Sequence, residues 1–253
     1  MTTTLLLLCV IAFLAGFVDA IVGGGGLIQT PAGLIMFPQE PVARVIGSLK
    51  IPSFTGTIFA AATYLKKVKI PITRLLAFTS IAFVAAFTGS FLLTKMSNQF
   101  MKPIIFGVLI IIAIYTYSKK ELGQQLKITS LKFPIYKGLL ICLVLGFYDG
   151  FIGPGAGSLL VLAFISNLGF DFMQANAHAK VVNLATNLGS ILLFTLKDSI
   201  LWNIAIPMAI CNALGGYMGS KLAIKKGNQF IRIFFLMVII ATLCRLGYDV
   251  FLH

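Results

Sequence analysis

Long apolar runs alternate with short polar connections along the chain, and the runs form two matching series of five. In the first series they cover about 4–22, 27–38, 43–65, 71–93 and 101–118; the second repeats them near 135–152, 157–168, 174–195, 200–221 and 231–252. A helix rises about 1.5 Å per residue and the apolar bilayer core is about 30 Å thick. Three runs in each half are therefore long enough to cross, while the first is borderline and the second is too short. The pattern predicts an all-α, polytopic transmembrane helical bundle.

The two series are copies of one another. The stretch GFVDAIVGGGG from Gly16 reappears as GFYDGFIGPGA from Gly146, and the stretch at 89–102 reappears at 219–232 with Gly, Ser, Leu, Lys, Asn, Gln and Phe in the same places. Both pairs are 130 positions apart, as Asp149 is from Asp19, with no gap between. Such self-similarity indicates a duplication.

The duplication divides the chain into three parts. We expect a first transmembrane repeat at 1–118, a basic linker at 119–134 and a second repeat at 135–253. The internal copy also argues against a cleaved signal peptide at the N-terminus, because a cleaved leader would not recur in mid-chain.

Basic residues change place between the halves. The connection at 66–74 carries four basic residues, whereas its partner at 196–204 carries one lysine beside an aspartate. The stretch at 95–102 carries two basic residues, whereas its partner at 221–232 carries four. Basic loops stay on the cytoplasmic side, so the halves are predicted to be inverted. The linker, 66–74 and 221–232 are then cytoplasmic in a cell inner membrane, and the N-terminus is outside. Inverted repeats are typical of secondary transporters.

Composition supports the bilayer and narrows the partners. The chain is 58% hydrophobic and 11% charged, against roughly 25% charged in a soluble domain. Its net charge of +13 lies in short clusters without interleaved aromatics, which favours lipid headgroups over nucleic acid. Four cysteines lie singly inside apolar runs, a spacing that indicates neither a metal site nor a disulfide framework. No cofactor is expected.

Glycines interrupt the chain before the second apolar segment of each half. These breaks contain Gly23, Gly24, Gly25 and Gly26 in the first half and Gly153 and Gly155 in the second. No GxxxxGK[ST] motif follows, so a nucleotide loop is disfavoured. Close helix packing is one interpretation, and we prefer it for the small residues at 85–89 and 215–219. For the breaks we favour a substrate loop, whose freed N–H groups face an anion at a helix start. Whether the short segments re-enter or cross stays open.

Charged residues within apolar runs are the next candidates. Asp19 and Asp149 precede the breaks, and Lys50 and Lys180 lie in the third segment of each half. For the aspartates we favour a structural cap or an ion pair with a lysine, and proton coupling is the alternative. For the lysines we favour contact with an anionic substrate across a pseudo-twofold axis, and an ion pair is the alternative.

A polar stripe adds cavity-lining candidates. It follows 4, 3, 4 spacing along one helix face and contains Asn176, Lys180, Asn183 and Asn187. Ser53 and Thr57 occupy the positions equivalent to Asn183 and Asn187. His178 lies off this stripe, so we expect a helix contact rather than a proton relay.

These motifs resemble a known family. GFVDAIVGGGG, GFYDGFIGPGAGS, AHAKVVN and the paired GS…NQF ends are similar to the sulfite exporter TauE/SafE (TSUP) family, and most of all to its YfcA-like branch. The resemblance implies a bacterial inner-membrane permease of two related halves for sulfite, sulfonates or related organic anions. One departure is Leu49 before Lys50, where the family usually has a polar residue.

Together these features predict a secondary transporter for a small anion, working by alternating access around a central site at the repeat interface. The partners are the anion and the lipid bilayer, with a proton as candidate coupling ion and a homo-oligomer left open. An uncoupled anion channel or uniporter is the alternative. An enzyme receives less support, because no metal spacing or nucleophile–base arrangement occurs.

Overall fold

The computed structural model describes residues 2–101, 104, 107 and 135–251, and all regular structure in that part of the chain is α-helical. Its helices are α1 (Thr2–Val22), α2 (Gly25–Met36), α3 (Val42–Leu65), α4 (Ile72–Lys95), α6 (Ile135–Phe151), α7 (Ala156–Leu168), α8 (Phe172–Leu196) and α9 (Trp202–Phe251). The predicted apolar runs are confirmed with their ends shifted by a few residues. The predicted linker and most of the run at 101–118 lie outside the described residues.

Helix α9 contains the last two predicted segments. The chain turns at Gly227, where φ is 76° and ψ is −170°, so α9 is two helices joined at a sharp kink. A positive φ of this kind favours glycine, which has no Cβ to clash with the backbone. The two-segment prediction therefore holds, with one residue instead of a loop between the segments.

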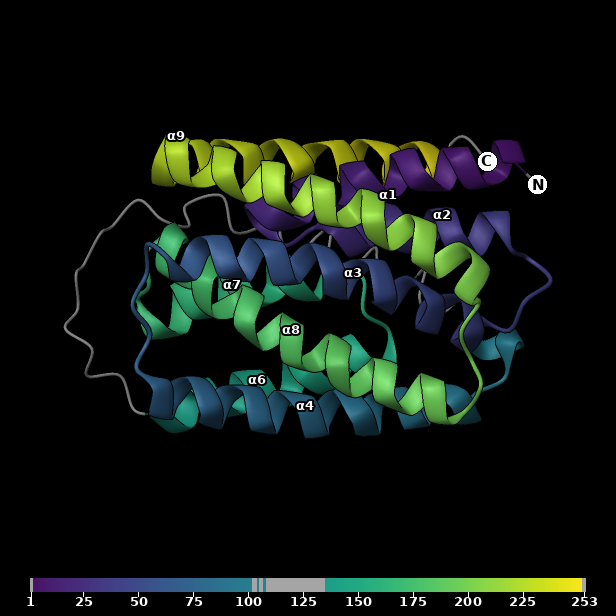
Figure 1. Ribbon diagram of the computed structural model, residues 1–253, viewed down its shortest axis with the longest axis horizontal. Helices are drawn as coiled ribbons and strands as arrows, with labels where there is room; N and C mark the ends of the chain where they lie inside the picture. Colours follow the sequence, from purple (N-terminus) through teal and green to yellow (C-terminus); the bar gives the residue numbers. More distant parts are fainter. Residues whose placement is uncertain (1, 102–103, 105–106, 108–134, 252–253) are drawn as a thin grey trace.

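The packing follows the repeat. Helix α1 packs on α9 and α4 packs on α6, with α3 and α8 between these two layers (Figure 1). Equivalent glycines allow both contacts: a Cβ on Gly89 would lie 2.3 Å from the Phe147 carbonyl oxygen, and one on Gly219 would lie 2.4 Å from that of Phe17. Small residues thus permit close backbone approach at 85–89 and 215–219, as predicted.

Equivalent helices end at opposite ends of the bundle. Figure 1 shows the loop after α3 at the left of the view and the loop after α8 at the right. The basic stretches 66–74 and 221–232 lie near one another, because Val68, Ile70 and Ile224 pack against the same hydrophobic cluster.

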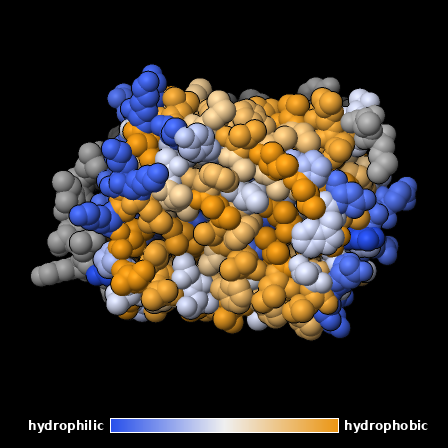
Figure 2. Space-filling view, in the orientation of Figure 1, coloured by the Kyte–Doolittle hydropathy of each residue, from blue (hydrophilic) through white to orange (hydrophobic). Residues whose placement is uncertain are grey.

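The outer surface suits a bilayer. Four helical stretches of 20 to 25 residues are long and apolar enough to cross one: Thr3–Val22, Val42–Leu65, Ile72–Lys95 and Phe172–Leu196. Figure 2 shows hydrophobic residues across the middle of the face in view and hydrophilic residues gathered at its two ends. Large apolar side chains such as Ile210 and Val84 are 60% or more exposed. Exposed apolar area on this scale indicates contact with lipid, and a polytopic helical membrane protein is confirmed.

Candidate functional site

The first glycine break touches the start of α7. Gly23 has a φ of 81°, and its carbonyl oxygen accepts a hydrogen bond from the backbone N–H of Ser158 at 2.9 Å. The Ser158 hydroxyl also donates to the carbonyl of Val22 at 3.0 Å. A Cβ on Gly23 would lie 2.3 Å from the backbone of Gly157, and a Cβ on Gly157 would lie 2.6 Å from the oxygen of Gly23. Only glycine fits at both positions.

The second break lies beside the first. Gly153 and Gly155 both have positive φ, at 91° and 75°, so the chain reverses between α6 and α7. The Tyr148 hydroxyl donates to the Pro154 carbonyl at 2.5 Å and holds this turn against α6. A Cβ on Gly26 would lie 3.2 Å from Pro154 Cα, so the two breaks are in contact. The structure therefore brings together segments that are about half the chain apart.

Lys50 from α3 binds the end of α6. Its ammonium Nζ donates to the carbonyl oxygen of Asp149 at 2.6 Å and to the carboxylate Oδ1 of the same residue at 2.8 Å. The two side chains are only 6% and 4% exposed. A cation at the carbonyl end of a helix is favoured by the helix dipole, which here adds to the ion pair.

Lys180 from α8 makes the equivalent contact with α1. Its Nζ donates to the Asp19 carbonyl oxygen and to Asp19 Oδ2, the latter at 2.7 Å. The two ion pairs are equivalent in the repeat, because Lys180 lies 130 positions after Lys50 and Asp149 lies 130 positions after Asp19. Of the two roles left open for these lysines, the structure shows ion pairs, and each pair joins one repeat to the other.

The two aspartates differ in how firmly they are held. Besides Lys50, Asp149 accepts hydrogen bonds at Oδ2 from the Asn183 amide at 3.1 Å and from the Thr186 hydroxyl. The residue is 3% exposed. Both of its carboxylate oxygens are therefore occupied by donors of α3 and α8.

Asp19 has fewer partners. Its Oδ2 receives Lys180, and its Oδ1 lies 3.3 Å from the backbone N–H of Gly25 at the start of α2. Its side chain is 20% exposed. The positions equivalent to Asn183 and Thr186 are occupied by Ser53 and by a glycine, so no second pair of side-chain donors reaches this carboxylate.

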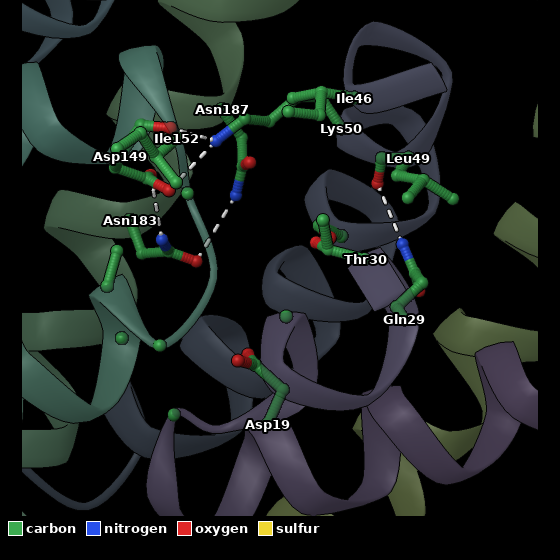
Figure 3. Close-up of a pocket in the computed structure, with 17 residues that line it drawn as sticks. Asp19, Gln29, Thr30, Ile46, Leu49, Lys50, Asp149, Ile152, Asn183 and Asn187 are labelled. Carbon is green, nitrogen blue, oxygen red and sulfur yellow. Dashed lines mark hydrogen bonds and ion pairs between the residues drawn. The ribbon is translucent and has the colours of Figure 1, made fainter. Parts of the chain in front are cut away.

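A cavity lies where the breaks and ion pairs meet (Figure 3). It holds about 440 Å³ of space, counted out to its open mouth. The predicted site residues that line it are Asp19, Gly23, Gly26, Lys50, Ser53, Asp149, Gly153, Gly155, Asn183 and Asn187. Both repeats contribute, so the cavity is at their interface.

Four predicted substrate-binding residues do not line this cavity. Lys180 is fully buried behind its contact with Asp19, and Thr57 is buried with its hydroxyl directed to Asn183 Oδ1 at 3.3 Å. Gly24 is the cap of α2, and the Gly25 amide is directed at Asp19. In this conformation neighbouring side chains cover Lys180 and Thr57, and the start of α2 faces Asp19.

Two polar residues of the cavity were missed by the sequence argument. Gln29 is 2% exposed; its amide nitrogen donates to the Leu49 carbonyl at 2.9 Å and its oxygen accepts from Asn212 at 3.0 Å. Thr30 lies beside it on α2 and also lines the cavity. A lone glutamine in a short apolar run was the available sequence signal. Gln29 and Thr30 supply polar atoms next to Leu49, the position at which the sequence departs from the polar residue of the family that it resembles.

His178 makes the predicted helix contact. Its Nδ1 lies 2.8 Å from the carbonyl oxygen of Gln174, and its ring packs against Phe170 with centroids 4.4 Å apart. Within the described part of the chain, no three His, Cys, Asp or Glu side chains are grouped so that they could hold a metal ion.

Comparison with known proteins agrees with this architecture. Residues 8–246 match the family model described as sulfite exporter TauE/SafE. A "probable membrane transporter protein" of Haemophilus influenzae is 33% identical over 96% of this chain and 94% of its own length. The "probable membrane transporter protein YfcA" of Escherichia coli K12 is 33% identical over 94% of this chain and 88% of its own. A Sinorhizobium protein named ORF9, with the same description, is also 33% identical. No solved structure matches the chain.

Proposed function

The chain belongs to the sulfite exporter TauE/SafE family, and on that premise we propose that it is a secondary transporter for a small anion such as sulfite or an organosulfonate. The observation that carries the proposal is the pair of reciprocal Lys–Asp contacts around a cavity where two helix breaks meet. Broken helices at matching places in two repeats are the usual construction of a transport site.

The cavity contains the groups that bind an oxyanion. Lys50 lines it, with its ammonium held by Asp149, and Gly23, Gly26 and Gly153 line it from the two breaks. Polar side chains from both repeats, including Thr30, add hydrogen-bond donors. In a low-dielectric surrounding such donors interact with an anion far more strongly than they would in water.

The two repeats line the cavity unequally, which supports alternating access. Ile46 and Leu49 of α3 face it, but their equivalents on α8, Asn176 and Ala179, are buried elsewhere. The Asn176 side-chain oxygen is buried without a hydrogen-bond partner in the described structure. Such a group costs about 1–3 kcal/mol. A second conformation in which Asn176 lines the cavity would satisfy it, as expected if the repeats exchange roles.

We further propose that the repeats are inverted in a cell inner membrane, with 66–74 and 221–232 cytoplasmic and the N-terminus outside. The opposite ends of α3 and α8 in Figure 1 and the clustering of both basic stretches at one end support this orientation. Reporter fusions that place the two stretches on opposite sides would refute it.

Anion flux in proteoliposomes tests the transport function. We expect the wild-type protein to move sulfite, thiosulfate or methanesulfonate, and Lys50→Ala and Lys180→Ala to reduce flux at least tenfold. Lys67→Ala is the matched control, because Lys67 is an exposed lysine of the α3–α4 connection. Unchanged flux in both cavity variants would refute the lysine role, and wild-type flux that ignores an imposed proton gradient would favour an uncoupled channel.

A further inference from the structure

We propose that Asp19, and not Asp149, is the carboxylate that releases its lysine when an anion binds, taking up one proton as it does so. This inference rests on the proposed anion transport and assigns different tasks to two residues that the repeat makes equivalent. It is carried by the difference in their contacts, exposure and place at the cavity.

Asp149 is held too firmly to move. Its carboxylate receives Lys50, Asn183 and Thr186, so three side chains from two helices would lose their acceptor if it left or became protonated. A proton on Oδ2 would also face the amide hydrogens of Asn183, which has no acceptor on that nitrogen. Asp149 therefore serves as the fixed anchor between the repeats.

Asp19 is free to change partner. It lines the cavity, its side chain is 20% exposed, and its one side-chain partner in the described structure is Lys180. Its other contact is the long 3.3 Å bond from the Gly25 N–H. An ammonium and a backbone N–H at a helix start are the donors that an oxyanion would use. Asp19 thus occupies, as a tethered carboxylate, the place that an anionic ligand would take between Lys180 and the Gly25 N–H. Figure 3 shows Asp19 at the edge of the cavity.

Charge balance then requires a proton. With both aspartates ionised, Lys50 and Lys180 are neutralised and the four groups carry no net charge. Lys180 is fully buried, so the cavity sees the Asp19 carboxylate in front of it. A proton bound to Asp19 leaves the Lys180 charge uncompensated, and a monovalent anion restores neutrality. One proton and one anion therefore enter together, and both leave when the Asp19–Lys180 pair forms again.

Among the described residues, Lys180 is the charged side chain that contacts the Asp19 carboxylate. Among the helices packed on α1, the described segments α2 and α7 contain no titratable side chain. On α3, the Tyr64 hydroxyl donates to the Ala20 carbonyl, and Lys50 is held by Asp149. On α8, His178 packs among phenylalanines, and on α9, Lys221 lies over the Tyr217 ring.

Binding and proton uptake by the purified full chain in lipid nanodiscs test the assignment. The probes are sulfite, thiosulfate and methanesulfonate; the last does not change its charge between about pH 5 and pH 8. For the wild type we expect uptake of close to one proton per methanesulfonate bound, and an affinity for this anion that rises as the pH is lowered. Asp19→Asn should bind methanesulfonate with an affinity independent of pH and without proton uptake.

Two further variants keep the result interpretable. Asp149→Asn should lose folded protein or anion affinity, but whatever binding remains should keep its proton uptake. Asp198→Asn is the control, because Asp198 is exposed in a loop with a φ of 50°, a conformation that asparagine accepts. Proton uptake that persists in Asp19→Asn, or anion binding that persists in Asp149→Asn without proton uptake, overturns the inference.

Infrared spectroscopy separates this inference from the proposed function. Lowering the pH of the wild-type protein should produce a protonated-carboxyl band with a component that is missing in Asp19→Asn and retained in Asp198→Asn. If none of the three anions binds but this band appears, the proposed substrate class fails and the assignment of Asp19 stands. If an anion binds and the band does not depend on Asp19, only the assignment fails.

Discussion

The ion pair of Lys50 with Asp149 allows a sharp test of how the repeats are held together. Replacing Lys50 by Met keeps the length of the side chain but removes the charge, and leaves Asp149 buried at 3% exposure. The variant Lys50→Met with Asp149→Asn removes both charges. We expect the single variant to be much less stable than the double variant, because a buried carboxylate without its partner destabilises the folded protein more than the loss of both charges does.

The magnitude follows from the geometry. At 2.8 Å and an effective dielectric constant of about 20, the attraction is about 6 kcal/mol. Much of this offsets the desolvation of the two charges, so the measurable cost of removing one partner is about 3–5 kcal/mol. The double variant should come within about 1–2 kcal/mol of the wild type, since neutral groups need no such compensation.

Comparison with the second pair sharpens the test. Lys180→Met leaves Asp19 with 20% of its side chain exposed to the cavity, where water can solvate it. The loss of stability should therefore be smaller than for Lys50→Met, about 1–3 kcal/mol. The expected order follows from the deeper burial of Asp149 and holds even though Asn183 and Thr186 also donate to that carboxylate.

The assay is a double-mutant cycle on unfolding in detergent micelles, followed by denaturant-induced loss of helical circular dichroism. A coupling energy near 3 kcal/mol between Lys50 and Asp149 is expected. Additive effects in the cycle would contradict the coupling between Lys50 and Asp149. An equal loss of stability in Lys50→Met and Lys180→Met would contradict the difference in burial between Asp149 and Asp19, on which the inference about Asp19 also depends.

Three other predictions concern the breaks and the cavity. Gly23→Ala should yield little folded protein, because its φ is positive and a Cβ there would meet the α7 backbone at 2.3 Å. Gly107→Ala should leave yield and flux unchanged, because among the described residues no atom outside its own helix lies within 4 Å of a Cβ there. Gln29→Leu should raise the KM for anion flux several-fold and lower stability by about 1–3 kcal/mol, since it leaves buried partners unsatisfied; an unchanged KM would remove Gln29 from the site. In a cysteine-free background, a cysteine at Ile46 should react with an impermeant thiol reagent from one side of the membrane and a cysteine at Asn176 from the other; labelling of both from the same side would contradict exchange of roles between the repeats.

Much of the fold could be predicted from the sequence because its causes are local. The helix bounds follow from the length of apolar runs, and the breaks follow from glycines such as Gly23 and Gly153, which have positive φ in the structure. The kink at Gly227 and the close packing at Gly89 depend likewise on the missing Cβ. A comparison of the two halves was enough to identify the breaks and the packing glycines, but the kink at Gly227 was not predicted, since the equivalent position in the first half is Ser97.

The sequence predicted most of the residues of the candidate site, but not the contacts among them. Ten of the predicted residues line the cavity, but Lys180 and Thr57 do not, and Gln29 was absent from the prediction. The pattern identifies polar residues on apolar helices, yet it cannot say which of them a neighbouring side chain covers. Lys180 is covered because Asp19 reaches it across the repeat interface.

The sequence by itself determined that there are two equivalent halves, each with one lysine, one aspartate and one glycine break. Tertiary structure alone decided that each lysine pairs with the aspartate of the other half, over separations of 99 and 161 residues. It also decided that the halves are unequal, with Asp149 anchored and Asp19 facing the cavity. The physical reason is that hydrophobic periodicity and backbone freedom act over a few neighbours. Ion pairing and burial depend on distances between helices that are set only when the two halves pack together.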